Sequence, residues 1–330
     1  MSASRIKALI IGCGNIAGGY DLRGRKHEVW SHVKAYSLTR GVDLVGVIDT
    51  SAHVASKFAK IWGAPFSGTE LVPALRKLNP DLVSICSPTE THVPIIKTLC
   101  RFGIGGILCE KPLSYDLRQA EQAIEICQKK GILLAVNYQR NWDRQLNRLG
   151  QAMREGEFGA IELIRVLYSK GLIHNGSHFV SLLEHWFENL RMQQLLAVRS
   201  SSRKDLQADF TATCSGATRI IFQNIPESAY ILNEVECFCE QGRLELRRDG
   251  LDVLWTERHQ DALLPQDRAL SGSSKRLPVT LHRAMLEVTK NMVATLRGKE
   301  KLKSDAARAL QTLRFCVGVR SLGRNWRKYD

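Results

Sequence analysis

The sequence predicts an α/β fold in which a doubly wound parallel-sheet domain precedes an α+β domain with a large mixed, mostly antiparallel sheet. Three observations predict it. Apolar runs alternate with helical stretches over the first 140 residues, a glycine-rich turn follows the first run, and several strand-like runs follow one another later in the chain. With 330 residues, 44% of them hydrophobic and 24% charged, the chain is long enough for two domains. This ordinary composition excludes a disordered tail protein, a collagen-like fibre and a membrane bundle.

The first domain, residues 1–140, is expected to hold the parallel sheet. Its strand candidates are continuous apolar runs, which are typical of strands buried on both faces. They are residues 6–11, 44–48, 82–86, 104–109 and 132–136. Helical stretches separate them, at 52–62, 71–78, 93–102 and 117–130. This alternation of strand and helix predicts right-handed crossovers between parallel strands.

The second domain, residues 141–330, has another pattern. It begins with helix, strand and helix, and then strands follow without helices between them, which indicates a mixed or antiparallel sheet. The early elements are 144–155, 161–169 and 177–190, and the later strands are 194–199, 209–215, 218–223, 229–240, 243–247 and 251–255. A polar stretch at 270–275 is interpreted as a surface loop. Two helices, 280–296 and 304–322, close the chain, and the last is a candidate for packing back on the first domain.

The turn after the first strand reads G-C-G-N-I-A, which gives Gly12-x-Gly14-x-x-Ala17. In a dinucleotide-binding turn the first glycine makes the bend, the second lets the backbone approach a pyrophosphate, and a small third residue lets helix and strand pack closely. Gly12, Gly14, Asn15 and Ile16 are therefore candidate cofactor contacts, with a helix N-terminus facing the phosphates. Because the turn follows a buried strand, it indicates a Rossmann domain.

The second strand ends in V-G-V-I-D at Asp49. A carboxylate there accepts hydrogen bonds from a ribose diol and repels a 2′-phosphate. Thr50 and Ser51 follow it, in place of an arginine, so NAD is favoured over NADP. A helix cap is the alternative role for Asp49.

The separation between the glycine turn and Asp49 exceeds the usual twenty or so residues, and G-Y-D-L-R-G-R-K-H-E-V-W is interpreted as an insertion. It carries Arg23, Arg25 and Lys26. Two interpretations stay open at this point: the loop closes over the site, or it lies on the surface.

The segment C-S-P-T-E-T-H ends the next long strand. The carboxyl ends of parallel strands form the ligand crevice, so Ser87, Pro88, Thr89 and His92 are candidate cofactor neighbours. An ordinary helix start is the alternative.

The strand expected at residues 104–109 continues directly into E-K-P, which is Glu110, Lys111 and Pro112. A lysine at the mouth of a buried strand is costly unless it is paired or useful, and partial burial beside a cationic nicotinamide would lower its pKa toward a working range. The alternative is that Lys111 only pairs with Glu110.

These motifs, above all E-K-P after the strand expected at residues 104–109, resemble those of the glucose–fructose oxidoreductase, inositol dehydrogenase and MocA (Gfo/Idh/MocA) family. The resemblance covers essentially the whole chain. The resemblance implies a Rossmann domain, an α+β domain whose sheet often serves as a dimer face, and hydride exchange between a nicotinamide and a ring hydroxyl or ketone of a sugar or cyclitol. It implies that Lys111 is catalytic and binds the reacting oxygen, with Glu110 on the cofactor side.

The second motif of the family is D-x-x-x-H, and here the segment reads G-L-I-H-N-G-S-H. His178 matches the family histidine, and His174 occupies the aspartate position, so a fixed negative charge is missing there. We hypothesise that His178 is the acid–base partner of Lys111, and that His174 relays a proton or lines the pocket. A purely positioning role for His178 is the alternative, and a two-histidine metal site lacks an acidic third ligand.

Tyr138, Arg140, Lys170 and Asn175 are candidate substrate contacts. Arg140 and Lys170 suggest an anionic substrate. The predicted function is NAD-dependent oxidation or reduction of a sugar, nucleotide-sugar or cyclitol. An NAD-requiring glycosidase and a non-catalytic NAD-binding regulator are the alternatives.

The formal net charge is +14, and residues 297–330 hold ten Lys or Arg against three acidic residues. A solvated basic helix and tail is one interpretation, and steering of an anionic substrate or a polyanion surface is another. Nucleic-acid binding is not expected. The nine scattered cysteines fit neither a disulfide framework nor a zinc site, and no apolar run fits a signal or membrane segment, so a cytoplasmic protein is expected. The family resemblance implies a homodimer or homotetramer formed through the second sheet.

Overall fold

The structure is a computed structural model, and it describes residues 4–202, 204–215, 218–228, 230–324 and 326. The chain divides into two compact units. The first comprises the residues up to Trp142 together with His282–Gln311, and the second comprises Asp143–Leu281 together with the residues from Thr312. The first division falls two residues after the expected boundary at 140. The helix that returns wholly to the first unit is α8 (Ala284–Leu296), whereas the last helix, α9 (Ala306–Arg324), belongs mostly to the second.

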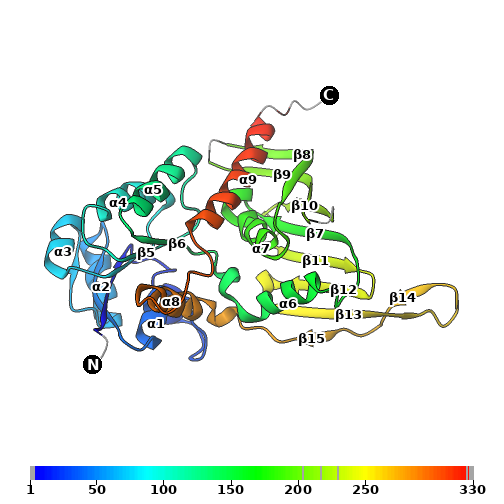
Figure 1. Ribbon diagram of the computed structural model, residues 1–330, viewed down its shortest axis with the longest axis horizontal. Coiled ribbons are helices and arrows are strands. Elements are labelled where there is room, and N and C mark those ends of the chain that lie inside the picture. The colour runs from blue at the N-terminus through cyan, green and yellow to red at the C-terminus, as the bar shows by residue number, and fades with distance from the viewer. Residues whose placement is uncertain (1–3, 203, 216–217, 229, 325, 327–330) are drawn as a thin grey trace. The chain divides into compact units, whose positions relative to one another are not determined.

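In the described part of the first unit, six parallel strands form one sheet in the order β3-β2-β1-β4-β5-β6 (Figure 1). The strands are β1 (Ile6–Ile11), β2 (Val42–Ile48), β3 (Ser67–Gly68), β4 (Leu82–Ile85), β5 (Gly106–Cys109) and β6 (Leu133–Val136). The order reverses between β1 and β4, and such a reversal opens a crevice at the carboxyl ends of the strands. The predicted doubly wound sheet is confirmed.

Helices cover both faces of this sheet. They are α1 (His32–Leu38), α2 (Ala52–Trp62), α3 (Leu71–Leu78), α4 (Thr89–Leu99), α5 (Leu117–Lys129) and α8. Helix α1 packs beside α8, and α4 packs beside α5 (Figure 1). Helix α4 begins four residues before the expected 93, at the residue after Pro88, because the proline fixes the chain for a first helical turn.

The core of the first unit joins strands and helices from distant parts of the sequence. Ile10, Val47 and Leu82 from the sheet are fully or almost fully buried together with Val288 and Met292 of α8. A fully buried apolar side chain of this size contributes about 1.5–3 kcal/mol. Helix α8 is therefore a part of this core, although nearly 140 residues separate it from the preceding piece of the unit.

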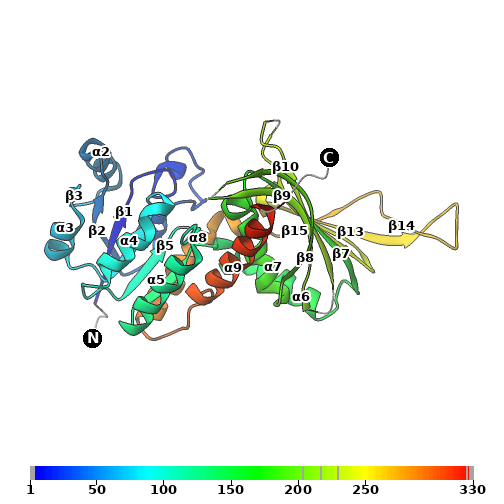
Figure 2. The ribbon, with the colours of Figure 1, turned by 90° about the horizontal axis from the view of Figure 1, so that it is seen from above.

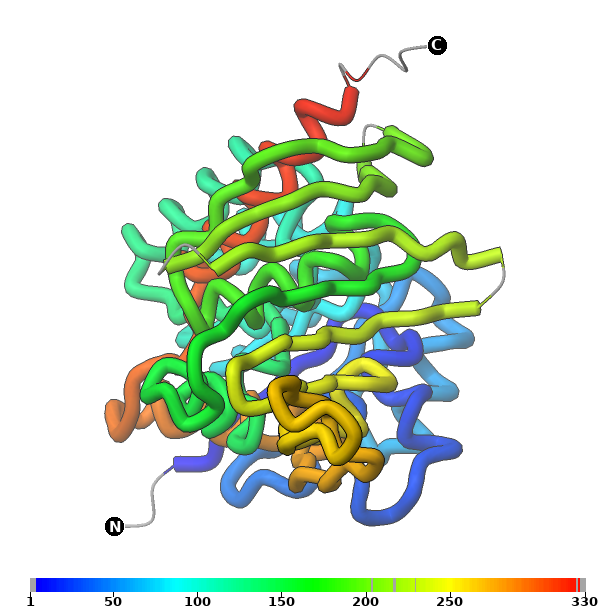
Figure 3. Tube along the Cα trace, turned by 90° about the vertical axis from the view of Figure 1, so that its right-hand side faces the viewer, coloured from blue at the N-terminus to red at the C-terminus, as the bar shows by residue number. Residues whose placement is uncertain are grey.

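The described residues of the second unit place nine strands in one sheet, with the order β14-β13-β12-β11-β7-β10-β9-β8 and with β15 paired to β13. The strands are β7 (Ile161–Ser169), β8 (Arg191–Ser201), β9 (Leu206–Thr213), β10 (Arg219–Ile225), β11 (Asn233–Cys239), β12 (Gly242–Arg247), β13 (Asp252–Gln260), β14 (Arg268–Leu270) and β15 (Lys275–Leu277). Figure 3 shows the long strands side by side. Strands β7 and β10 are parallel and the other pairs are antiparallel, which confirms the predicted mixed sheet.

Helices α6 (Arg144–Arg154) and α7 (Ser177–Phe187) pack together in this unit. From α9, Phe315 contacts the stacked rings of Phe210 and Phe222 on the sheet. Strands β13 and β14 extend beyond the rest of the sheet as an arm (Figure 2), and the polar stretch predicted as a loop lies between β14 and β15.

Of the basic segment near the C-terminus, residue 325 and residues 327–330, which include Arg327 and Lys328, lie outside the described residues. Over the part of the chain that the structure describes, no helix is both long and apolar enough to cross a membrane.

Candidate active site

The glycine turn brings the ends of β1 and β4 into contact. Gly12 has a φ of +88°, and a methyl group on it would lie 2.7 Å from the backbone nitrogen of Ser87. Glycine is therefore required there by both conformation and space. At Gly14 no described atom comes within 4 Å of the place that a methyl group would take, so the backbone is open to a ligand. This is the arrangement that a pyrophosphate needs.

The sequence predicted that a helix begins at the glycine turn. The chain does not run from that turn directly into a long helix. It makes one helical turn, in which Gly18 donates to the Gly14 carbonyl, and then leaves. The hydrogen-bond ladder resumes at α1, where the His32 nitrogen donates to the Ile16 carbonyl at 3.2 Å and the Val33 nitrogen donates to the carbonyl of Ala17 at 3.0 Å. In an uninterrupted helix residues 20 and 21 would make these bonds. The insertion inferred from the sequence thus interrupts the first helix after a single turn.

A cavity of about 660 Å³ lies in the crevice where the strand order reverses. Five predicted cofactor residues line it, namely Gly12, Gly14, Asp49, Ser87 and Pro88. Residues that were not predicted also line it, and these include Cys13, Thr50, Thr69, Leu71, Thr91 and Ile95. Thr69 and Leu71 follow β3, a strand of two residues that is too short to leave a periodic signal in the sequence.

Asp49 directly follows β2 and lies beside the glycine turn that follows β1. Its Oδ2 accepts a hydrogen bond from the Cys13 nitrogen at 2.9 Å, and its Oδ1 accepts one from the Ser51 nitrogen at 3.0 Å. It is Ser51 whose side chain caps α2, by accepting from the Val54 nitrogen. The two bonds to Asp49 fix its carboxylate on the cavity wall, where a ribose diol can reach its remaining lone pairs.

Asn15, Ile16, Thr89, His92 and Glu110 are not among the described residues that line this cavity. Asn15 is exposed on the turn, Ile16 is half-buried, and Thr89 begins α4. The other two are buried and act through neighbouring groups.

His92 joins the loops that follow β4 and β5. Its Nε2 lies 2.9 Å from the Ser87 carbonyl oxygen, and its Nδ1 lies 3.0 Å from that of Pro112. Burial lowers the pKa of His92 below its ordinary value, although both carbonyl contacts favour the charged ring. The ring thus ties the cavity wall to the E-K-P segment.

Glu110 is the centre of a buried polar network beneath Lys111. Its Oε1 lies 2.8 Å from His32 Nε2 and accepts a hydrogen bond from Asn137 Nδ2 at 2.6 Å. His32 Nδ1 in turn lies 2.8 Å from the Ser84 hydroxyl. The backbone nitrogen of Lys111 donates to Glu110 Oε2 at 3.3 Å.

These partners decide the ionisation of Glu110. Burial alone would raise the pKa of its carboxyl, but the hydrogen bonds from His32 and Asn137, with the charges of His32 and Lys111, bring that pKa below its ordinary value. The carboxylate is therefore held as an anion. His32 was not predicted as a site residue, because it lies far from E-K-P in the sequence and matches no motif used here. Asn137 was a candidate only from its position at the end of a predicted strand, beside Tyr138, and not as a partner of Glu110.

Lys111 follows β5 and precedes Pro112 across a cis peptide bond, and its side chain is partly exposed. The residue therefore stands at the carboxyl end of the sheet, with an anion fixed at the preceding position. A fixed anion beside an ammonium favours the charged form and limits where that group can move.

In the second unit, His174 lies on a turn with π-type hydrogen bonds, and His178 lies in the first turn of the helix that follows it. The turn covers Leu172–Gly176 and leads directly into α7. His174 is exposed and His178 is half-buried. The Gly176 nitrogen bonds to the carbonyl of Gly171, five residues earlier, so the turn is wider than an α-helical one. A helix was expected from residue 177 and is found there, and the wider turn before it means that His174 and His178 are not a regular i, i+4 pair.

Asp205 holds this turn from the start of β9. Its carboxylate accepts hydrogen bonds from the backbone nitrogens of Ile173 at 2.7 Å and His174 at 2.9 Å. A methyl group on Gly171 would lie 1.9 Å from Asp205 Oδ2, so only glycine fits. Burial raises the pKa of Asp205, which the backbone bonds and the charge of Arg320 offset in part. Sequence reasoning missed Asp205, because it lies about thirty residues from the histidine motif and belongs to no pattern.

The predicted substrate residues divide between the two units. In the first, Tyr138 and Arg140 are buried, at 2% and 6% exposure. In the second, Lys170 has a left-handed backbone with a φ of +62°, and its carbonyl accepts a hydrogen bond from Asn224 Nδ2 at 2.7 Å. Asn175 lies within the turn that Asp205 holds. The contacts of Lys170 and Asn175 place them at the ordered start of the histidine segment.

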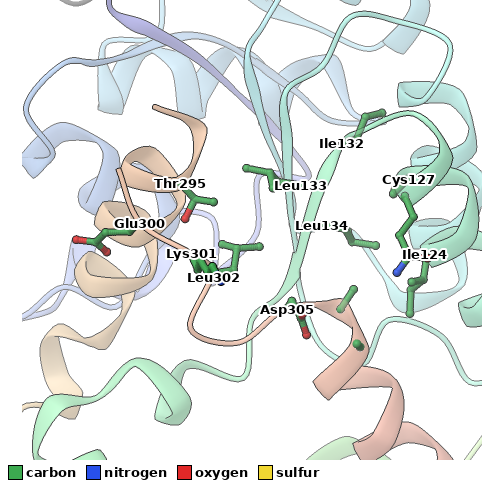
Figure 4. A pocket seen from close by; sticks show the side chains of 13 residues that line it. Ile124, Cys127, Ile132, Leu133, Leu134, Thr295, Glu300, Lys301, Leu302 and Asp305 are labelled. Carbon is green, nitrogen blue, oxygen red and sulfur yellow. The ribbon is translucent and has the colours of Figure 1, made fainter. Parts of the chain in front are cut away.

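A second cavity of the first unit, of about 400 Å³, lies between α5, β6 and the chain that follows α8 (Figure 4). Its wall includes the apolar side chains of Ile124, Leu134 and Leu302. None of the described predicted site residues lines it, so the crevice between β1 and β4 is the better candidate for chemistry. Among the described residues, no group of three or more His, Cys, Asp or Glu side chains could hold a metal ion.

Residues 6–138 match the model of the Gfo/Idh/MocA group, an oxidoreductase family with a NAD-binding Rossmann fold. The inositol 2-dehydrogenase of Rhizobium meliloti (strain 1021) is 27% identical over 135 residues, which are 41% of this chain and 40% of that protein. The chain thus matches less than half the length of such curated relatives, and the matched part includes the glycine turn, Asp49 and E-K-P.

Solved structures resemble the chain over nearly its full length. A 3-ketoreductase from Actinomadura kijaniata, in complex with NADP and TDP-benzene, has a TM-score of 0.78 at 17% identity, covering 96% of this chain and 98% of that one. A UDP-N-acetylglucosamine 3-dehydrogenase from Acidithiobacillus ferrooxidans has a TM-score of 0.70 at 16% identity, covering 97% and 98%. At these identities the likeness extends the shared fold to the second unit, and no further.

Proposed function

We propose, on the premise that the Rossmann unit of this chain belongs to the Gfo/Idh/MocA family of oxidoreductases, that the protein is a NAD-dependent enzyme. It transfers a hydride between the nicotinamide and a ring hydroxyl or ketone of a sugar, nucleotide-sugar or cyclitol. One observation carries the proposal. The glycine turn and Asp49 line a cavity at the carboxyl ends of the parallel strands. Lys111 stands at the same edge of the sheet, and its backbone nitrogen donates to the buried, ionised carboxylate of Glu110.

The residues present fit a nicotinamide dinucleotide. Gly12 and Gly14 leave the backbone open to a pyrophosphate, and the Asp49 carboxylate is oriented toward a ribose diol. The bound cofactor supplies the hydride acceptor or donor at its nicotinamide ring. Because Asp49 would repel a 2′-phosphate, and because Thr50 and Ser51 follow it, NAD is proposed as the preferred form.

The chain's own residues handle the proton of the reacting hydroxyl. Lys111 is proposed to hold the reacting oxygen, and His178 is proposed as its acid–base partner in the second unit. Glu110 fixes the position of the lysine and stays ionised. In alcohol oxidation the hydroxyl proton leaves to the base as the carbon–hydrogen bond gives up its hydride, so the substrate is oxidised by two electrons and the dinucleotide is reduced.

The test compares Lys111→Ala and His178→Ala with Lys57→Ala, which removes an exposed lysine of α2. We expect Lys111→Ala to lower turnover about 10²–10⁴-fold while the Kd for NADH stays within about twofold. His178→Ala is expected to lower turnover as well, and Lys57→Ala to change neither quantity. Near wild-type turnover of both site variants would refute these assignments.

The substrate class is tested with a panel of free sugars, cyclitols and nucleotide-linked sugars, by following NADH at 340 nm as an absorbance change. Net reduction of NAD by any of these alcohols supports a dehydrogenase. Release of an aglycone from an aryl glycoside without net NADH would indicate the glycosidase alternative. Binding of NADH with no conversion of any compound would favour a regulator.

We further propose that the protein is a homodimer or homotetramer formed through the second unit's sheet. The burial of β7 alternates, so Leu163 and Leu167 are half-exposed while Ile164 and Val166 are fully buried. Arg165 lies between these two leucines on the same face and pairs with Glu236 at 3.4 Å. The face that the proposal uses is therefore a mixed one, with apolar side chains around an ion pair, as the interfaces of many oligomers are. Mass measurement by light scattering tests this, and replacing Leu163 and Leu167 by Glu should shift the mass to that of a monomer. A cytoplasmic location stays a prediction.

A further inference from the structure

The segment between Gly18 and His32 is an excursion from the first helix of the Rossmann unit. Its two ends are joined through the helix ladder, because His32 and Val33 donate to the carbonyls that precede the excursion. The helix itself needs none of the intervening residues. Val29 of this segment packs against Met285 and Leu286 of α8, and its nitrogen donates to the His282 carbonyl at 2.8 Å. The exposed residues before it have no such place in the core.

A buried carboxylate organises the excursion. The Asp21 side chain is fully buried and accepts hydrogen bonds from the backbone nitrogens of Trp30, at 3.1 Å, and Ser31, at 2.8 Å. The Ser31 hydroxyl also donates to Asp21, and Lys34 Nζ lies 3.3 Å from it. Buried hydrogen bonds to a carboxylate are among the stronger polar contacts in proteins. Asp21 therefore joins the start of the excursion to its end through these hydrogen bonds.

The excursion forms a small cup on the surface. A cavity of about 330 Å³ is lined by Tyr20, Arg23, Gly24 and Trp30. Tyr20 is 54% exposed, and the Trp30 indole nitrogen donates to Glu28 at 2.9 Å. The volume is at the low end for ligand pockets and suits one ring system. Two aromatic residues and a guanidinium are the side chains that bind a flat ring and an adjacent anion.

The charge of the excursion also favours an anion. Arg23, Arg25 and Lys26 are exposed. Its two acidic residues are engaged, Asp21 in the buried cluster and Glu28 with Trp30 and the backbone nitrogen of Arg25. Glu28 keeps its negative charge, because the hydrogen bond from Trp30 lowers the pKa of its carboxyl. Three exposed cations thus stand against this one carboxylate, and the net charge beside the cup is positive.

The cup is connected to both parts of the candidate site within the first unit. At one end, the Tyr20 nitrogen donates to the Asn15 carbonyl in the glycine turn at 3.0 Å. At the other, Trp30 comes two residues before His32, whose ring contacts Glu110, the neighbour of Lys111. The backbone that forms the cup is thus continuous with the glycine turn at one end and with the His32–Glu110 contact at the other.

We propose that this cup binds the nucleoside diphosphate group of a nucleotide-linked sugar substrate, with the base against Tyr20 and Trp30 and the phosphates at Arg23, Arg25 and Lys26. The inference rests on the proposed function and selects one substrate class within it. Among the substituents of a sugar, a nucleoside diphosphate combines a flat ring with negative charge. A neutral aryl group would leave Arg23, Arg25 and Lys26 without an anion to bind.

The test uses the full chain saturated with NADH, so that the probe cannot enter the cofactor cavity. Uridine diphosphate is titrated by calorimetry into the wild type and into Tyr20→Ala, Tyr20→Phe and Arg23→Ala. Tyr20→Ala is expected to weaken binding about tenfold to a hundredfold, as loss of a ring that stacks on a base does. Arg23→Ala is expected to weaken it about tenfold, with a smaller salt dependence, and Tyr20→Phe should bind within about twofold of the wild type.

Arg40→Ala removes another exposed arginine of the same unit and serves as the matched control, with unchanged binding expected. Equal affinity of all variants for uridine diphosphate, or no binding to the wild type, would overturn the inference. So would a cup that binds phenyl β-glucoside in a Tyr20-dependent way but not uridine diphosphate. Binding of NADH to the wild type is measured first, so that a failure of the proposed function, in which NADH does not bind, is distinguished from a failure of the cup to bind uridine diphosphate in the NADH-saturated protein.

Discussion

At the scale of single residues, Glu110 shows how a buried charge can position the backbone of its neighbour, Lys111. Its carboxylate receives hydrogen bonds from His32, Asn137 and the Lys111 backbone, so the chain bends at E-K-P around a fixed anion. An unpaired buried carboxylate would be strongly destabilising, and these partners make its burial tolerable. Both the stability and the position of Lys111 therefore depend on the ionisation of Glu110.

Replacing Glu110 by Gln is expected to lower the free energy of unfolding by about 1.5–3 kcal/mol at pH 7, the value of a hydrogen bond to a charged group. Because the pKa of Glu110 is lowered in the folded state, its stabilisation is present above the ordinary pKa of about 4.5 and is lost as pH falls through the folded value. The difference between the two proteins should therefore be constant near neutrality and narrow below about pH 4.5. Urea denaturation from pH 3 to 8 measures it.

Glu125→Gln is the control for that series. Glu125 is exposed and pairs with Lys129 on the surface of α5, and such pairs add little to stability. Its free energy of unfolding should follow that of the wild type. A Glu110→Gln protein whose deficit is the same at pH 3.5 and pH 7 would show that ionisation of Glu110 does not stabilise the fold.

Asp49→Asn tests cofactor choice. The amide keeps an acceptor oxygen for the Cys13 or Ser51 nitrogen but removes the negative charge. We expect the Kd for NADPH to fall about tenfold while that for NADH rises less, because the repulsion of the 2′-phosphate disappears. Fluorescence titration of both nucleotides measures this. Asp43→Asn, on the same strand and paired with Arg5 at the surface, should leave both constants unchanged, and a wild type that prefers NADPH would contradict the assignment.

Motifs identified residues that line a common cavity, and they failed for residues that contact only other side chains or the backbone. The glycine turn, Asp49, Ser87 and Pro88 line one cavity, as their positions at strand ends indicated. His92 carried the same kind of signal, yet its ring is turned to backbone carbonyls. His32 and Asp205 could not be found, because their partners lie far away in the sequence and no local pattern depends on them.

At the scale of elements, the turn before α7 depends on a carboxylate from another strand. Asp205→Ala removes the acceptors of the Ile173 and His174 amides. Those amides should exchange at least about tenfold faster with deuterium, and turnover should fall, because the histidine segment loses its fixed start. Hydrogen exchange read by mass spectrometry across residues 170–180 measures the first effect. Gly171→Ala, which places a methyl group on the same carboxylate, should act in the same direction.

Glu257→Ala provides the comparison for this turn, since Glu257 is an exposed residue of β13 in the same unit. Its exchange over residues 170–180 should equal that of the wild type. Unchanged protection of that segment in Asp205→Ala would mean that the π-type turn is stable without the carboxylate.

Long apolar elements were predictable and their irregular connections were not. β1, α2 and α3 have the predicted bounds, because continuous burial or a helical period marks them along their whole length. The sequence revealed the insertion after Gly18 by length alone. The place where the insertion interrupts the first helix could not be predicted. It depends on the carbonyls of Ile16 and Ala17, which accept hydrogen bonds from the nitrogens of residues that come after the insertion.

At the scale of the whole molecule, the chain leaves the first unit at Trp142 and returns to it at His282. A division at 140 into two consecutive domains was the simplest interpretation of the change from alternating helices and strands to successive strands. The return of α8 carries no signal of that kind, since an amphipathic helix fits either core equally well. Only the packing of Val288 and Met292 against the parallel sheet identifies its unit.

Residues 1–142 alone should therefore fail to fold cooperatively. They lack the buried α8 side chains Met285, Leu286, Val288, Met292 and Val293, each worth about 1.5–3 kcal/mol, which together approach the roughly 5–15 kcal/mol that stabilises a typical domain. They also lose Asn291, which accepts from Trp142 Nε1 at 3.0 Å. A fusion of residues 1–142 through a Gly/Ser linker to 282–311 should unfold cooperatively by circular dichroism and bind NADH. The same fusion with Val288→Asp should do neither. If residues 1–142 alone bound NADH as tightly as the full chain, α8 would be a covering helix and not part of the core.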